Sequence, residues 1–234
     1  MSSEFNYFAI GSMSIEKKKL LSSVYLPFIM LFIMWVVKVV EIAFDIQLSW
    51  LGVHPKHLDG IPGIILSPFL HGDIQHLMAN SVSFLVLAVA LFYFYREISL
   101  KVLIGIWLLA GMFIWFSGQE SSHHIGASSL IYGLAAFLFV SGAIRKDTRL
   151  AALAMVVAFL YGSIVWGVFP DFFPKKNISW EGHLGGFISG IILAFYYKSS
   201  GPKRKKYSWE YEEEEHMEED QNAYWEIKNQ DSTS

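Results

Sequence analysis

The chain of 234 residues contains no cysteine. This absence excludes disulfide bonds, thiolate chemistry and metal sites built from cysteine, so a side-chain nucleophile would have to be an oxygen. The sequence also lacks an H-E-x-x-H helix motif. The first long apolar run has no small-residue cleavage pattern after a short core, so we expect its helix to stay in the mature protein. Charge is scarce as well, because Asp, Glu, Lys and Arg make up 17% of the residues and 53% are apolar, which excludes an ordinary soluble domain.

Long apolar stretches dominate what is present. A helix needs about 20 mostly apolar residues to span a bilayer, and several stretches approach that length. The sequence therefore predicts an all-α membrane protein, a bundle of six transmembrane helices with both termini on one side. The stretches cover residues 22–43, 74–95, 99–117, 127–144, 150–168 and 180–197.

Basic residues indicate which side holds the termini. They precede the first helix, follow the last, and occupy the two connections on the same face. The opposite connections carry only Lys56, Lys175 and Lys176, so the termini are predicted to be cytoplasmic. The basic residues on the predicted cytoplasmic side are Lys17, Lys18, Lys19, Arg96, Lys101, Arg145, Lys146, Arg149, Lys198, Lys203, Arg204, Lys205 and Lys206.

The chain divides into three predicted regions. Residues 1–20 form a cytoplasmic lead, residues 21–198 the six-helix domain, and residues 199–234 a charged cytoplasmic tail that we expect to be disordered and without a catalytic role. Within the domain, residues 44–73 make the longest external connection. Its apolar residues are interspersed with prolines, which suits short helices lying at the level of the lipid headgroups.

Three polar motifs occur where a polar stretch runs into an apolar helix, and all three fall on the predicted outer side. Ser, His and Asn are costly to keep inside hydrocarbon, so their default interpretation is a functional site. Lys38 and Glu41, three residues apart in the first helix, are instead expected to form a neutralising ion pair. The motifs span residues 76–80, 126–129 and 182–186.

Ser128 and His183 are candidates for a nucleophile and its base. Ser128 begins the fourth helix, where unpaired N–H groups and partial positive charge favour an oxyanion. Two small-residue faces, one on this helix and one on the sixth, are each typical of close helix packing. If these faces pack together, His183 reaches the Ser128 hydroxyl and can act as base and then as acid. The faces consist of Ser129 and Gly133, and of Gly186 and Gly190.

His76 and Asn80 lie four residues apart, on one face of the second helix. Both can donate hydrogen bonds and are candidate oxyanion ligands, although a polar contact between helices is the alternative interpretation. Tyr132, one turn after Ser128, is placed either to restrict the His183 imidazole or for ordinary aromatic packing. His71 is expected to order the external connection rather than to catalyse.

Taken together, the motifs resemble the rhomboid family of intramembrane serine proteases. The family pattern is H-x-x-x-N in the second core helix, G-x-S-G at the start of the fourth, and a His followed by small residues in the sixth. This chain supplies His76-x-x-x-Asn80, Gly126-Ala127-Ser128 and His183-Leu184-Gly185-Gly186, over about residues 20–198. Ser129 replaces the usual glycine after the nucleophile, and the Trp-Arg pair common in the first external loop is missing.

The resemblance implies a role for each motif residue. Ser128 would be the nucleophile and His183 the general base and acid, while His76 and Asn80 would stabilise the oxyanion and Tyr132 would support the histidine. It implies a serine endopeptidase without metal or cofactor that cleaves single-pass membrane proteins in or near their transmembrane segments, within the lipid bilayer. The expected location is a bacterial inner membrane with the site towards the outer face, and no nucleic-acid partner is expected.

Two other functions are compatible with the sequence. The first is a catalytically inactive rhomboid-like protein that binds membrane clients, and retention of both Ser128 and His183 argues against it. The second is a histidine-rich metal-binding membrane protein, against which stands the absence of an evident ligand spacing. Its histidines, all on the predicted outer side, are His54, His57, His71, His76, His123, His124 and His183.

Overall fold

The computed structural model describes residues 2–162, 179–202 and 217, with side chains from residue 15 onward. Backbone contacts divide the chain into two units, residues 1–202 and residues 203–234. Several predictions lie outside the described residues. They concern the end of the helix predicted at 150–168, the basic residues Lys175 and Lys176, and most of the charged tail.

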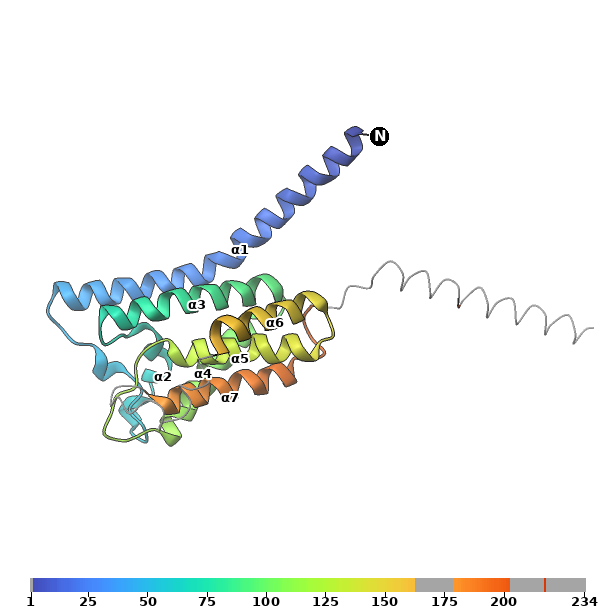
Figure 1. The fold of residues 1–234 in the computed structure, drawn as a ribbon. Helices are drawn as coiled ribbons and strands as arrows, with labels where there is room; N and C mark the ends of the chain where they lie inside the picture. Colours follow the sequence, from blue (N-terminus) through green and yellow to red (C-terminus); the bar gives the residue numbers. More distant parts are fainter. Residues whose placement is uncertain (1, 163–178, 203–216, 218–234) are drawn as a thin grey trace, which may run out of the picture. The chain divides into compact units, whose positions relative to one another are not determined.

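Every described element of regular structure is a helix, and six of these helices are long (Figure 1). Each overlaps one of the predicted apolar stretches, which confirms the all-α fold. Among the described residues, three segments have the length and apolar composition to cross a membrane, namely Ile15–Ala43 of α1 and the whole of α3 and α4. The long helices are α1 (Ser2–Ala43), α3 (Ile74–Phe94), α4 (Ser99–Ser117), α5 (Ser128–Ile144), α6 (Thr148–Tyr161) and α7 (Trp180–Tyr196).

Helix α1 starts much earlier than its apolar stretch. The stretch was expected to begin near residue 22, whereas the helix begins at Ser2. Glu16 and the three lysines that follow it are good helix formers, and the first proline of the chain is Pro27. The helical backbone therefore continues out of the apolar stretch, and most of the predicted lead of residues 1–20 is helical.

The first turns of three long helices are capped by a side chain, as expected where backbone N–H groups lack helical partners. Asp73 accepts a hydrogen bond from the backbone N–H of His76 at the start of α3. Asp147 caps α6 and Ser179 caps α7 in the same way. The residue preceding α5 is Ala127, which has no side-chain acceptor, so the first N–H groups of α5 are left available to another acceptor.

Helix α5 is the centre of the bundle. It contacts α3, α4, α6 and α7, and 12 of its 17 residues are buried. Figure 1 shows α5 running beside α7, with α3 next to α1. The residues of α5 that join the hydrophobic core are Leu130, Ile131, Leu134, Ala135, Phe137 and Leu138.

Helices α5 and α7 approach so closely that main chain meets main chain. A Cβ atom on Gly186 would overlap the carbonyl oxygen of Ser129, and a Cβ on Gly190 would overlap that of Gly133. The contact advances by four residues on both helices, so the two run parallel and in fixed register. Small residues at such positions are what permits close helix packing.

The connection between α1 and α3 consists of short helical segments, as its sequence predicted; their position relative to lipid headgroups stays a prediction. It is held against α4, because the Trp107 Nε1–H donates to the carbonyl oxygen of Ile64 at 2.9 Å and Gly111 leaves room for the Ile64 side chain. The segments are η1 (Ser49–Leu51), η2 (Leu58–Gly60), α2 (Gly63–Leu66) and η3 (Ser67–Phe69).

The α5–α7 contact gives a stability prediction. We expect Gly186→Ala to destabilise the fold by about 1–3 kcal/mol, because the added methyl group overpacks against the Ser129 main chain. The thermal unfolding midpoint in detergent measures the effect. The matched control is Gly72→Ala, where no heavy atom lies within 4 Å of an added Cβ. Equal midpoints for the two variants would contradict the packing argument.

Candidate active site

Ser128 begins α5 directly after a tight turn. Gly126 has a φ of 108°, a left-handed conformation that favours glycine, and its N–H donates to the carbonyl oxygen of Ser67 at 2.9 Å. The turn thereby rests on the connection between α1 and α3. Ala127 is fully buried, whereas Ser128 is half-buried. The hydroxyl therefore lies at the start of the central helix, beside N–H groups that no side chain caps.

His76 and Asn80 lie against the same turn. A Cβ atom built on Gly126 would lie 2.8 Å from His76 Cε1 and 3.6 Å from Asn80 Nδ2. Both side chains come from the first two turns of α3. The structure thus brings the two predicted oxyanion ligands to the residue two positions before Ser128, and it explains why that position must be glycine.

The Asn80 amide is unusual because its Nδ2 is buried and has no hydrogen-bond partner among the described residues. The whole residue is 6% exposed. An unpaired buried donor costs about 1–3 kcal/mol, and such a group in a native fold needs an explanation. A negatively charged oxygen beside the Gly126 turn would supply the missing acceptor.

His183 lies in the first turn of α7 and is 9% exposed. Its ring is stacked on the ring of Tyr132, with centroids 4.0 Å apart and planes inclined by 8°. Tyr132 follows Ser128 by four residues, so both lie on one face of α5. The contact of Gly186 with Ser129 fixes the depth, since His183 is one turn before Gly186. The imidazole is therefore on the face of α5 that carries Ser128.

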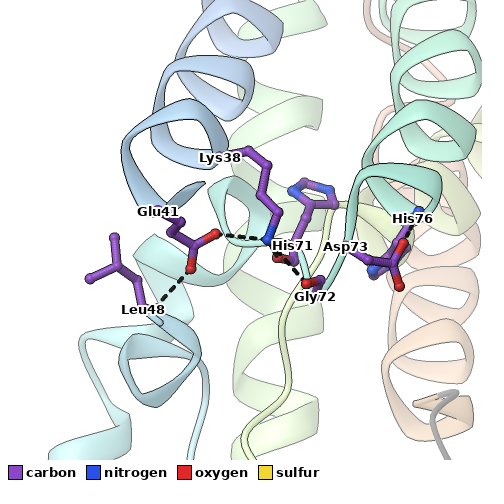
Figure 2. Close-up of polar contacts among 7 residues, drawn as sticks. All are labelled: Lys38, Glu41, Leu48, His71, Gly72, Asp73 and His76. Atoms are coloured by element: carbon purple, nitrogen blue, oxygen red, sulfur yellow. Dashed lines mark hydrogen bonds and ion pairs between the residues drawn. The ribbon is translucent and has the colours of Figure 1, made fainter. Parts of the chain in front are cut away.

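The ion pair expected between Lys38 and Glu41 is confirmed, with Nζ and Oε2 3.1 Å apart. It does more than neutralise charge (Figure 2). Lys38 also donates to the carbonyl oxygens of His71 and Gly72, at 2.9 and 3.0 Å, and Glu41 accepts from the Leu48 N–H at 2.8 Å. The pair thereby holds both ends of the connection between α1 and α3.

The ring of His71 packs against the ring of His76. The two rings meet edge to face with centroids 5.1 Å apart; both residues are labelled in Figure 2. His71 is 2% exposed, and burial lowers its pKa to about 4. Its ring is therefore neutral at neutral pH and places no positive charge beside His76. This agrees with its expected role in ordering the connection.

His124 makes a contact with the start of α7 that sequence reasoning missed. Its Nδ1 lies 2.6 Å from the hydroxyl oxygen of Ser179, and Ser179 caps α7 by accepting from the Gly182 N–H. The Ser122 hydroxyl donates to the Gln119 carbonyl oxygen and so accepts from the His124 Nε2–H, which leaves His124 Nδ1 to accept from the Ser179 hydroxyl. The loop before Ser128 is thus tied to the start of the helix that carries His183. No sequence spacing links residues 124 and 179, so only the fold reveals this contact.

The remaining histidines near this end of the bundle form a separate group. His54, His57 and His123 have rings in mutual contact through His54, and none of them contacts the Tyr132–His183 stack in the ring contacts of the described residues. The structure places the residues predicted from the sequence in two groups. His76, Asn80, Ser128, Tyr132 and His183 gather around the α5 start, with Ser129, Gly133, Gly186 and Gly190 forming the α5–α7 contact beneath.

Comparison with known proteins gives consistent findings. A family model described as the rhomboid domain matches residues 58–200, which include all of the candidate site residues. An uncharacterized protein of Mycobacterium tuberculosis (strain H37Rv) is 34% identical over 178 residues, covering 74% of this chain and 73% of that protein. One from Mycobacterium leprae (strain TN) is 36% identical over 162 residues, covering 66% and 62%. A protein of Acanthamoeba polyphaga mimivirus, named as a rhomboid protein, is 27% identical over 132 residues, covering 55% and 70%.

The two buried histidines outside the long helices predict a pH dependence of stability. Burial lowers the pKa of His71 and of His124 to about 4, from about 6.5 in an unfolded chain. Between these values the unfolded state binds protons that the folded state does not. Stability therefore falls as the pH drops from about 6.5 to 4, by about 3 kcal/mol for each histidine.

We expect the fall in thermal unfolding midpoint between pH 7 and pH 5 to be smaller in His71→Gln than in the wild-type protein. Gly72→Ala, which changes the neighbouring residue without removing a titratable group, serves as the control, and it should keep the wild-type pH dependence. An identical dependence in all three proteins would show that His71 is not the group responsible.

Proposed function

The chain belongs to the rhomboid family, and from this premise we propose that it is an intramembrane serine protease with a Ser128–His183 dyad. The observation that carries the proposal is the stack of His183 on Tyr132, together with the α5–α7 register set by Gly186 and Ser129. These contacts support a position of the imidazole on the face of α5 that carries Ser128, the first residue of the helix. A serine hydroxyl needs such a base to become a nucleophile.

In the proposed reaction, Ser128 Oγ attacks the carbonyl carbon of the scissile peptide bond while His183 takes the hydroxyl proton. The tetrahedral oxyanion accepts hydrogen bonds from Asn80 Nδ2, from His76 and from the first N–H groups of α5. His183 then gives its proton to the leaving amine, and an acyl-enzyme on Ser128 remains. Water activated by His183 hydrolyses this ester and restores the hydroxyl.

The proposed setting is a bacterial inner membrane crossed by six helices, with cytoplasmic termini and a site that opens towards the outer face. This orientation rests on the distribution of basic residues. The substrates are single-pass membrane proteins. A helical peptide bond is shielded by its own hydrogen bonds, so segments with small or helix-weakening residues near the cut are the ones that react.

The packing around Ser129 supports activity rather than a catalytically inactive, client-binding protein. Serine stands there in place of the family glycine, and the concern is that its side chain would separate α5 from α7. Gly186 packs on the Ser129 carbonyl and supplies the close approach from the α7 side, which supports the view that serine is tolerated there. Ser129 itself is accommodated with 8% of its surface exposed.

The deciding experiment is cleavage of a single-pass reporter with a small-residue, helix-weak segment by purified protein in liposomes. Wild type should cut it, and Ser128→Ala and His183→Ala should each lower the rate by about 10³-fold or more, because the dyad acts as a unit. Ser141→Ala, a buried serine further along α5, is the matched control and should stay active. Binding without cleavage by wild type across several reporters would favour the inactive, client-binding protein.

Asn80 gives a second prediction that separates catalysis from stability. Asn80→Leu keeps the side-chain shape and removes the unpaired buried donor. We expect cleavage to fall by about 10²–10³-fold with little change in KM, the usual effect of losing one oxyanion donor, while the thermal unfolding midpoint stays equal or rises. Full activity would show that Asn80 is not an oxyanion donor, and a lower unfolding temperature would indicate a structural role.

A further inference from the structure

Two distant segments meet beside the start of the connection between α1 and α3. Val53 and His124 form an isolated antiparallel bridge, with backbone hydrogen bonds of 3.0 and 2.9 Å in the two directions. His54 and His123 are the next residues outside this bridge, and their rings lie 4.6 Å apart. The backbone pairing therefore presents two imidazoles from separate segments at one place.

His54 is also close to two further groups from its own turn. Its ring is stacked on that of His57, with centroids 3.9 Å apart, and its Nδ1 lies 3.3 Å from Asp59 Oδ2. One potential ligand atom from each of the three residues lies within 4.8 Å of the other two. The sequence carries this group as His54-x-x-His57-x-Asp59, a spacing that sequence reasoning had not singled out.

The hydrogen bond on the far side of the His54 ring determines what its Nδ1 can do. Nε2 lies 3.1 Å from the backbone carbonyl oxygen of Glu120, and because a carbonyl only accepts, Nε2 carries a proton. In a neutral imidazole the lone pair of Nδ1 then faces the Asp59 carboxylate, which also only accepts. A cation must therefore lie on or between them, either a second ring proton or a metal ion.

This arrangement is the usual environment of a metal-binding histidine, whose other ring nitrogen donates to a carbonyl or carboxylate. The turn is held in shape by hydrogen bonds on both sides: the Lys56 N–H donates to the Trp115 carbonyl, and the Trp115 Nε1–H donates to the His57 carbonyl, each at 2.9 Å. Lys56 Nζ is 2.9 Å from Glu120 Oε1, so its charge is paired away from the three ligand groups.

We propose that His54, His57 and Asp59 bind a divalent transition-metal ion of the zinc class. Two imidazoles and a carboxylate are ligands that zinc accepts at about 2.0–2.2 Å in tetrahedral geometry, which sets neighbouring ligand atoms about 3.4 Å apart. The His54–Asp59 pair already has this separation. His57 is exposed, so rotation of its side chain closes the remaining distance.

The ring of His123, whose centroid lies 4.6 Å from that of His54, is a candidate for the fourth ligand. An ion held in this way would fasten the segment after Val53 to the loop that leads to Ser128. None of the three ligands belongs to the proposed peptidase machinery, so the site is independent of whether the chain cleaves peptide bonds.

The test is zinc binding by the full-length protein, purified in detergent without a polyhistidine tag. Competition with a chromogenic chelator should give one Zn²⁺ per chain, and Co²⁺ should give the absorption bands of a tetrahedral N/O site. His54→Ala and Asp59→Asn should weaken binding by more than the roughly 10–100-fold that loss of an outer-shell partner costs. Zinc should also raise the thermal unfolding midpoint of wild type, because it binds the folded state.

Asp45→Asn is the matched control, since Asp45 is an exposed carboxylate of the same connection outside the cluster, and it should bind Zn²⁺ as wild type does. Asp59→Asn changes only an exposed side chain, so a folded variant is expected. Absence of stoichiometric binding, or binding unaltered by both cluster substitutions, would overturn the proposal and leave the second ring proton as the cation beside Asp59.

Discussion

The rest of the site depends on the main-chain contact between α5 and α7. Gly186 and Gly190 let the two parallel helices approach until glycine backbone touches the carbonyls of Ser129 and Gly133. A contact of this kind has no side chain that can change rotamer, so it fixes depth and rotation together. This register fixes the position of the His183 ring, and stacking on Tyr132 fixes the plane of the ring. Apolar surface alone cannot provide such precision between helices in lipid, where hydrocarbon competes equally well.

At the polar end of the bundle, the connection between α1 and α3 positions the residues around the start of α5. The Lys38–Glu41 pair holds the connection that ends in His71 and Gly72, Asp73 then starts α3, and the first turns of α3 present His76 and Asn80 to Gly126. On the other side, His124 joins the loop before Ser128 to the cap of α7. Two histidines buried in neutral form thus support a site in which a third is proposed to carry the proton.

Sequence periodicity and apolar run length located the six long helices, because burial in lipid or in a core demands long apolar stretches, and small-residue spacing identified the faces on which α5 and α7 pack. Contacts between side chains that are far apart in the chain could not be predicted from the sequence. The role of Lys38 looked local because its nearest charged neighbour is three residues away, whereas its other partners follow 33 and 34 residues later. The sequence named His124 only as one of the outer histidines for the same reason, since its partner Ser179 follows 55 residues later.

Two of the three described residues with unpaired buried polar atoms lie near the candidate site. Buried side-chain donors without partners are avoided in native proteins because each costs about 1–3 kcal/mol. Among the described residues, such atoms occur in His71, Asn80 and Tyr95, and the first two lie at the end of the bundle where α3 and α5 begin. Leucine in place of Asn80 would avoid this cost. In the proposed reaction, an oxyanion beside the uncapped first turn of α5 would supply the acceptor that the Asn80 amide lacks.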